Sequence, residues 1–97
     1  MLYVSTRGGM PAQPFCDVLL EGLAPDGGLA VPQSLPSISA SQLEAWRTLS
    51  YPELAAAVLG YFATDIAPDL LAQMTSQAYT PEKFSSADIV AVRPLSD

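Results

Sequence analysis

The residues best suited to chemistry stand near the start of the 97-residue chain, in the segment Ser5-Thr6-Arg7-Gly8-Gly9. Two hydroxyls, a guanidinium and the backbone N–H groups of a glycine turn could cradle a phosphate. The segment lacks the lysine and the spacing of a P-loop, and no long helix follows directly to lend its N-terminal dipole. The alternative is that the hydroxyls and glycines build a strand-to-turn transition while Arg7 makes a structural ion pair. We favour this structural interpretation.

Three other side chains could in principle be reactive or bind a metal, but their sequence contexts favour structural roles. The one lysine, Lys83, could form a Schiff base, yet it lies in a polar, turn-rich segment that does not desolvate its amine. Asp26, followed by two glycines, supplies one carboxylate on a tight turn, which is too few oxygens for Ca²⁺. Cys16 can form no internal disulfide, and its place in a helical pattern predicts a partly buried core residue rather than a reactive thiol.

Histidine, the commonest general base, is absent from the sequence. A zinc site therefore lacks ligands, and a Ser-His-Asp or Cys-His device lacks its base. The acidic residues near predicted helix starts are Glu53, Asp65, Asp69 and Glu82. Carboxylates at such positions satisfy free N–H groups and the helix dipole, so capping explains them. The sequence predicts no catalytic, cofactor-binding or metal-ligating residue in this chain.

A helix-rich pattern with a few short strands must position these side chains. Strands are expected near residues 2–5, 28–32 and 89–93, the last because its residues are mostly β-branched. A turn at Ala24-Pro25-Asp26-Gly27 leads into the second strand, since Pro and Asp favour the turn and Gly tolerates a positive φ. About three strands beside three to four helices predict a small, helix-dominated α+β domain.

Apolar spacing and capping residues predict where the first helices begin. The first starts at Pro14 and ends at Gly22, which can take the left-handed conformation beyond a helix end. A second starts at Ser39 or at Ser41, because each has a Gln or Glu three residues further on. Ser50-Tyr51-Pro52-Glu53 is a clearer capping box, and a helix with a regular apolar stripe follows it.

The last helices are predicted in the same way. One begins near Ala67, with Pro68 in its first turn. Its inward-facing residues should be Leu70, Leu71, Met74 and Ala78. Thr80-Pro81-Glu82 starts one more turn or short helix, which Ser85 and Ser86 should end.

Composition and charge limit the class of protein. A chain of 97 residues can form one small core, and 49% hydrophobic with 14% charged residues is typical of a folded domain. The net charge of −6, without a basic block, excludes nucleic acid as a partner, because phosphate contacts need clustered Lys and Arg. The most apolar stretch, 54–63, has half the length that spans a bilayer, and the first residues lack the charged and apolar regions typical of a signal peptide. We therefore expect a cytoplasmic protein that does not enter a membrane.

Two glycine-containing segments bracket the first predicted helix: Tyr3-Val4-Ser5-Thr6-Arg7-Gly8-Gly9 before it, and Gly22-Leu23-Ala24-Pro25-Asp26-Gly27-Gly28-Leu29-Ala30-Val31-Pro32 after it. In order and spacing the pair resembles the N-terminal opening of the threonine synthases. The resemblance continues more loosely through 49–55 and 67–71, so it covers nearly the whole chain. The family's pyridoxal-phosphate lysine, in a His-Gly-Pro-Thr-x-Ala-Phe-Lys segment, has no counterpart here.

The resemblance implies that residues 1–97 are the N-terminal domain of a threonine synthase, without the catalytic domains that bind pyridoxal phosphate. The parent enzyme would convert O-phosphohomoserine and water to threonine and phosphate, with pyridoxal phosphate as its cofactor. This domain would hold no cofactor, would be inactive by itself, and would pack on the remaining catalytic domains of the same chain. Ser5, Thr6 and Arg7 are then candidates for an interface or for shaping substrate access.

A free-standing acidic protein-interaction module without enzymatic activity is the alternative to a threonine synthase domain. If the chain is one domain of a larger enzyme, apolar surface that faces the catalytic domains is exposed when the domain stands alone. Exposed apolar patches tend to find partners. We therefore expect the isolated chain to self-associate through that surface, with Arg7 and residues 89–92 nearer to it than the helix that carries Leu54.

Overall fold

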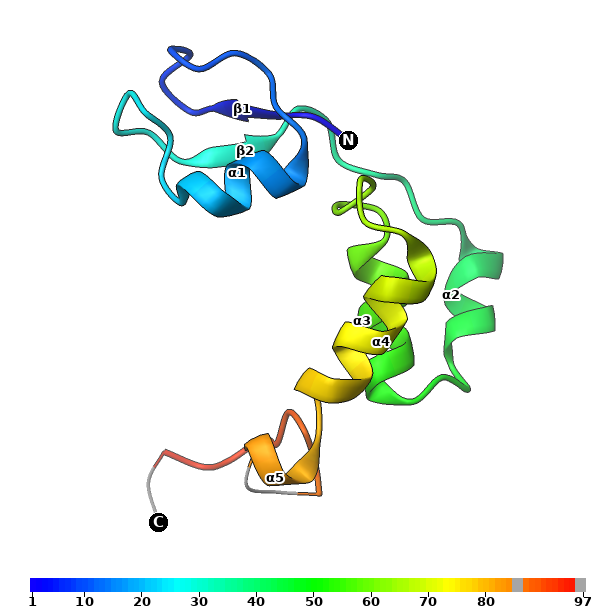
Figure 1. The fold of residues 1–97 in the computed structure, drawn as a ribbon. Helices are drawn as coiled ribbons and strands as arrows, with labels where there is room; N and C mark the ends of the chain where they lie inside the picture. The colour runs from blue at the N-terminus through cyan, green and yellow to red at the C-terminus, as the bar shows by residue number, and fades with distance from the viewer. Residues whose placement is uncertain (85–86, 96–97) are drawn as a thin grey trace.

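The structure is a computed structural model that describes residues 1–84 and 87–95. Its elements in chain order are β1 (Tyr3–Ser5), α1 (Phe15–Glu21), β2 (Ala30–Pro32), α2 (Ala40–Trp46), α3 (Tyr51–Leu59), α4 (Pro68–Ala78) and α5 (Pro81–Phe84). Figure 1 shows two units joined by an extended segment, with β1, β2 and α1 in the first and α2, α3 and α4 in the second. The predicted helix-dominated α+β class is confirmed for the described residues.

The first unit is a two-stranded antiparallel sheet with α1 against it. The register pairs Tyr3 with Pro32, Val4 with Val31 and Ser5 with Ala30. Tyr3 also exchanges two backbone hydrogen bonds with Gln13, of 2.8 and 3.0 Å, which bring the chain before α1 back to β1. The Tyr3 ring lies 5.9 Å from that of Phe15, the first residue of α1. This aromatic contact helps to hold α1 on the sheet.

The first two helices begin close to where the sequence predicts. Pro14 precedes α1, which therefore starts one residue later than expected, and Gly22 follows it with a positive φ of 81°. Ser39 accepts a hydrogen bond from the backbone N–H of Gln42 at 3.1 Å. Of the two starts that the sequence allowed for α2, the structure has the one at Ser39 and not the one at Ser41.

Helices α3 and α4 pack side by side as a hairpin that forms the centre of the second unit. The indole of Trp46, at the end of α2, meets the ring of Tyr61 edge-on at 6.1 Å. Tyr79, just after α4, meets Tyr51 at 5.1 Å and stacks on Phe84 of α5 at 5.5 Å. Aromatic pairs therefore link α2 and α5 to the hairpin.

The buried face of α4 differs from the predicted one. The pattern predicts that Leu70, Leu71, Met74 and Ala78 face inward. In the structure Leu71 and Thr75 are buried, whereas Leu70 is 50% and Met74 40% exposed, and Ala78 is exposed as well. The Thr75 hydroxyl donates to the carbonyl of Ala72 at 3.0 Å, and this local bond allows a polar side chain to occupy the core.

The third strand predicted near 89–93 is not formed. These residues make a turn followed by irregular backbone, and the sheet of the described chain has two strands. β-branched side chains favour a strand only where a neighbouring strand offers them packing and hydrogen bonds. Val90 and Val92 are largely exposed instead. The predicted helix end at Ser85 and Ser86 lies outside the described residues.

The chain is more open than a domain of this size usually is. Its radius of gyration is 16.2 Å, and its accessible surface is 6932 Å². A compact domain of about 100 residues has a radius near 13 Å, and a compact protein of this mass exposes about 5300 Å². The buried hydrophobic residues are Tyr3, Met10, Ala24, Ala63 and Leu71. Within the described residues, no helix is long and apolar enough to span a membrane.

Ser50→Ala should lower the free energy of unfolding by about 1 kcal/mol, the usual cost of losing an N-cap. The Ser50 hydroxyl accepts the backbone N–H of Glu53 at 3.4 Å and donates to Glu53 Oε1 at 2.9 Å, so α3 begins at the predicted cap. Leu54→Ala truncates a half-buried side chain in the next turn and should cost more, about 2 kcal/mol. Urea unfolding of both variants gives the order, and a larger loss from Ser50→Ala would contradict it.

Candidate functional site

The carboxylate of Asp26 is the centre of a hydrogen-bond cluster that joins the two glycine-containing segments. It accepts the Ser5 hydroxyl at 2.7 and 2.8 Å, the backbone N–H of Gly9 at 2.7 Å and that of Gly28 at 2.9 Å. Ser5 is buried and Asp26 half-buried, so water only partly screens these bonds. We refer to residues 5–9 and 26–28 together as the Asp26 cluster.

Thr6 and Arg7 complete the cluster on its exposed side. Thr6 Oγ1 accepts the backbone N–H of Leu29 at 3.0 Å, and the Thr6 N–H donates to the Leu29 carbonyl at 2.9 Å. Arg7 Nη1 donates to the backbone carbonyl of Asp26 at 3.1 Å. Arg7 therefore has the structural role that we favoured, although its hydrogen bond goes to a carbonyl where the sequence predicts an ion pair. Both side chains belong to exposed residues.

Close packing explains two of the glycines in the cluster. A Cβ at Gly28 would press on Ser5 Oγ and lie 3.0 Å from Thr6 Oγ1. A Cβ at Gly9 would lie 2.7 Å from Asp26 Oδ2. The contacts with Ser5 Oγ and Asp26 Oδ2 are shorter than carbon and oxygen atoms tolerate without bonding, so a side chain at either position would displace the cluster.

The cluster changes what segment 5–9 can bind. The hydroxyl and N–H donors that could hold a phosphate include those of Ser5 and Gly9, and both already bind the Asp26 carboxylate. That negative charge would also repel a second anion. The structure therefore favours the structural interpretation of this segment over a phosphate cradle. In the described part of the chain, no three His, Cys, Asp or Glu side chains come together as a metal-binding group.

A second carboxylate, that of Asp65, ties the two units together. It accepts the backbone N–H of Cys16, in the first turn of α1, at 2.9 Å. The Tyr3 hydroxyl donates to the carbonyl of Phe62 at 2.7 Å in the same α3–α4 connection. Asp65 was predicted to cap the helix that follows it in sequence, and the structure places it instead at the start of α1, 49 residues away.

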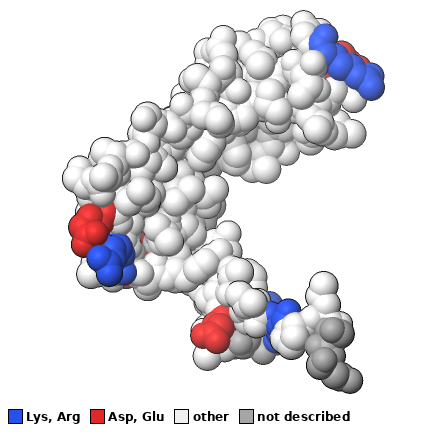
Figure 2. Space-filling model, turned by 180° about the vertical axis from the view of Figure 1, so that it is seen from behind, with Lys and Arg blue, Asp and Glu red and all other residues white. Residues whose placement is uncertain are grey.

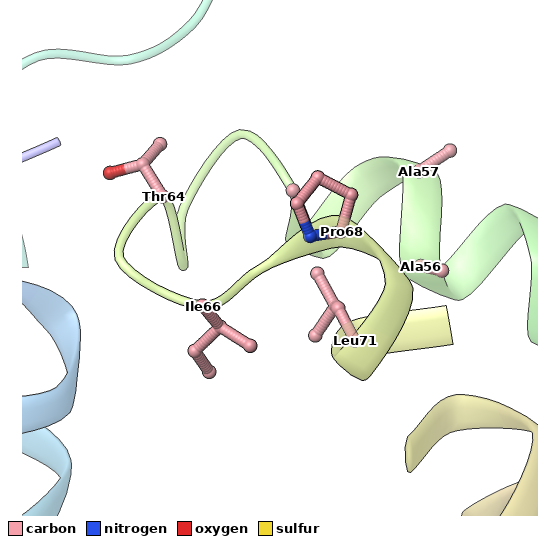
Figure 3. Close-up of a pocket in the computed structure, with 7 residues that line it drawn as sticks. Ala56, Ala57, Thr64, Ile66, Pro68 and Leu71 are labelled. Carbon is pink, nitrogen blue, oxygen red and sulfur yellow. The ribbon is translucent and has the colours of Figure 1, made fainter. Parts of the chain in front are cut away.

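An apolar hollow lies between α3 and α4, beside the connection that joins them (Figure 3). Its volume is about 340 Å³, and its lining consists of Ala56, Ala57, Gly60, Thr64, Ile66, Pro68 and Leu71. In Figure 3 the two alanines lie on α3, and Pro68 and Leu71 lie on α4. None of these side chains is charged, so this hollow contains no group able to act as a general acid or base.

Sequence reasoning treated segment 5–9 and Asp26 as separate features, and the structure brings them together. The signal that could have linked them is the pairing of the two short strands. Segment 5–9 follows β1 and residues 26–28 precede β2, so antiparallel pairing puts both turns at one end of the sheet.

Acid should destabilise the chain through Asp26 and Asp65. Hydrogen bonds from Ser5, Gly28 and Gly9 hold the pKa of Asp26 below its ordinary value of 3.8, and the bond from the Cys16 N–H lowers the pKa of Asp65. A pKa lowered by folding gives stability that is complete above the unfolded value and is lost as the pH falls through the folded value. Both contributions should therefore stay constant from pH 7 to about 5 and decline below about pH 4.

Urea midpoints measured between pH 7 and pH 2 test this expectation. Asp26→Asn should flatten part of the decline, because the amide does not titrate. Glu21→Gln, at an exposed position on α1, is the matched control for removing one carboxylate outside the Asp26 cluster. Identical acid profiles for Asp26→Asn and the wild type would show that the cluster adds no pH-dependent stability.

Residues 2–79 match the family model described as "Threonine synthase N terminus". Threonine synthase of Corynebacterium glutamicum is 45% identical over 103 aligned residues, which cover 100% of this chain and 21% of that protein. Threonine synthase of Methylobacillus glycogenes is 41% identical over 87 residues, 90% of this chain and 18% of that protein. The chain thus spans about a fifth of the length of these curated relatives.

The fold is also found among solved structures. The X-ray crystal structure of PLP-bound threonine synthase from Brucella melitensis is similar to this chain, with a TM-score of 0.77 and 48% sequence identity. The similarity covers 81% of this chain and 17% of the Brucella chain.

Proposed function

The chain belongs to the threonine synthase family, whose N-terminal part it matches, and from this premise we propose that it is the N-terminal domain of a larger threonine synthase. The observation that carries the proposal is the family match over residues 2–79 in a chain that spans 21% of its Corynebacterium relative. The parent protein would contain the catalytic domains. A free cysteine, Cys16, is compatible with the cytoplasmic location that we propose for it.

We propose that the parent converts O-phosphohomoserine and water to threonine and phosphate, with pyridoxal phosphate (PLP) as its cofactor. The PLP-bound Brucella relative supports the choice of cofactor. The described residues of this chain do not themselves fit PLP. Lys83 is exposed on the four-residue helix α5, and two donors of segment 5–9, the Ser5 hydroxyl and the Gly9 N–H, are engaged by Asp26. Parts of the parent outside this chain would therefore hold the cofactor.

Within the parent this domain would be an accessory to catalysis, and we assign Thr6 and Arg7 to its contact with the catalytic domains or to substrate access. Both residues are exposed, and the Asp26 cluster fixes the backbone that carries them. Ser5 is buried and would act by positioning them through its bond to Asp26. Arg7 donates one hydrogen bond to the Asp26 carbonyl, and a guanidinium has five N–H donors. Further donors of Arg7 could therefore bind a carboxylate or phosphate of the catalytic domains or the substrate.

The test of the proposed function is product formation by the parent protein. Purified parent with PLP should release threonine and phosphate in equal amounts from O-phosphohomoserine. The 97-residue chain alone should release neither, and mixing it with PLP should give no aldimine absorbance near ~400–430 nm, since Lys83 lacks a desolvating site. A parent without this activity would overturn the proposal. A stoichiometric band in the isolated chain, lost in Lys83→Ala, would overturn the assignment of cofactor binding to the rest of the parent.

The isolated chain should self-associate at high concentration. Large apolar side chains exposed by more than half are Leu19, Leu20, Leu23, Leu29, Leu35, Leu43, Val90, Val92 and Leu95. Burying them against a second copy is favourable, while the net charge of −6 on each copy opposes the contact. Sedimentation should therefore show association that rises with protein concentration and with added salt. A strictly monomeric species at millimolar concentration would contradict this prediction.

A further inference from the structure

Helix α1 has one apolar face that lines two adjoining hollows. The first, of about 230 Å³, lies between α1 and the α3–α4 hairpin, and its lining includes Phe15, Leu19, Leu71, Met74 and Tyr79. The second, of about 420 Å³, lies between α1 and the sheet and shares Phe15 and Leu19 with the first. Because Phe15 and Leu19 line both, the two hollows adjoin at α1, and we call them together the α1 groove.

The α1 groove carries no charge, although it is open to water. None of the described residues that line it is charged. On the face of the molecule that Figure 2 shows, the charged side chains lie at the ends and at the outer bend, and the concave edge between the two units is uncharged. Leu19 is 64% and Met74 40% exposed within the groove. A chain that places its charges elsewhere and leaves leucine and methionine open in a hollow has the features of a covered surface.

The chain as a whole exposes more surface than a compact protein of its mass. The chain exposes 6932 Å², roughly 1600 Å² more than a compact protein of its mass. A standard interface removes about 800 Å² from each partner. The additional exposed surface of the chain, of which the α1 groove is a part, therefore exceeds the area that one partner contributes to a standard interface.

We propose that the α1 groove receives an apolar, uncharged segment of the parent threonine synthase that follows residue 97. This inference rests on the proposed function. The matched family model describes an N terminus, and about four-fifths of the Corynebacterium relative lies outside the matched part, so the parent has ample chain to cover the groove. A second copy of this domain is a poorer occupant, because each copy carries a net charge of −6.

The test compares two neighbouring positions on α1 in the full-length parent. Leu19 lines both hollows, whereas Leu20 lines neither and is 86% exposed. Leu19→Cys and Leu20→Cys are made separately on a Cys16→Ala background, and their reaction with a maleimide is followed on the peptide by mass spectrometry. The Leu19→Cys thiol should react at least ~10-fold more slowly than the Leu20→Cys thiol, since a covered group reacts only when the interface opens.

Helix α4, on the opposite wall of the groove, provides a second pair of positions for cysteine labelling, in case a substitution on α1 prevents folding. Met74→Cys lies in the groove, and Gln73→Cys is its exposed neighbour on α4. A photoreactive maleimide at position 19 or 74 then identifies the occupant in a mixture of ¹⁴N- and ¹⁵N-labelled parent. Cross-links within one chain to residues beyond 97 are the expected result.

Equal labelling rates for both members of a pair, or cross-links between light and heavy chains, would overturn the proposal. Protection by a different protein would overturn it equally. Threonine formation is measured on the same samples. If the labelling contradicts the groove proposal but the parent still forms threonine, the proposed function is unaffected. If the parent forms no threonine, the proposed function is contradicted.

Discussion

Leu71→Ala should be the most destabilising single truncation in the α3–α4 hairpin, with a loss of about 2–5 kcal/mol in the free energy of unfolding. Leu71 is one of the few buried hydrophobic residues, with 5% of its surface exposed. It lies on α4 and lines both the hollow between α3 and α4 and the α1 groove. Removing its side chain would join these two hollows, and the small core has little else with which to fill the space.

Leu70→Ala is the matched control for this prediction, because it is the adjacent leucine on the same helix and is 50% exposed. It should cost about 1 kcal/mol or less, as is usual for a partly exposed site. Urea unfolding of the 97-residue chain, with the slope of the transition compared among variants, measures both values. Equal losses at the two positions would mean that α4 is rotated relative to the structure described here.

The contrast between these leucines also shows where sequence patterns stop being informative. Adjacent residues on a helix point about 100° apart, and a stripe containing Leu70, Leu71 and Met74 fits a helical period about as well as the observed one. The observed face includes Thr75, which a hydrophobicity pattern does not select. Its hydroxyl is satisfied by the Ala72 carbonyl, a bond that exists only once the helix has formed.

Helix caps and turns were predicted well, because the interactions that form them involve residues close together in the sequence. The cap at Ser50, the cap at Ser39 that was one of two predicted alternatives, and the turn that ends at Gly27 each depend on side chains within three residues. The strand predicted near 89–93 failed for the opposite reason. A strand needs a partner, and the sheet of the described residues consists of β1 and β2 alone, so residues 89–93 pair with neither.

The Asp26 cluster was predicted only in part: its residues were noticed, but their contact was not. The residue types of segment 5–9 and of Asp26-Gly27-Gly28 were both recognised as unusual. Their meeting depends on the pairing of β1 with β2 across 21 residues of chain between Ser5 and Asp26. Periodicity cannot reveal such a contact, and only the resemblance to a family suggested that the two segments belong together.

Gly28→Ala should therefore destabilise the chain by about 1–3 kcal/mol, the range for overpacking a well-fitted site. The new Cβ would press on Ser5 Oγ and lie 3.0 Å from both Asp26 Oδ1 and Thr6 Oγ1. The Gly28 N–H also donates to the Asp26 carboxylate, so any backbone shift that relieves the clash lengthens this hydrogen bond. Gly60→Ala is the control, because its Cβ would meet only the carbonyls of Ala56 and Ala57, at 3.3 and 3.4 Å. It should stay within ~1 kcal/mol of the wild type.

A double-mutant cycle separates the clash from a general effect of the added methyl group. Ser5→Ala removes the oxygen that the new Cβ would press on, and it also removes the hydroxyl bond to Asp26. If the clash dominates, the double variant Ser5→Ala with Gly28→Ala should lose less free energy of unfolding than the two single variants lose together. The difference should be at least ~0.5 kcal/mol. Strict additivity in urea unfolding would mean that Ser5 and Gly28 are not in contact, and the Asp26 cluster would then have to be arranged differently. A sub-additive result would show that the two segments of the family motif are energetically coupled across the end of the sheet.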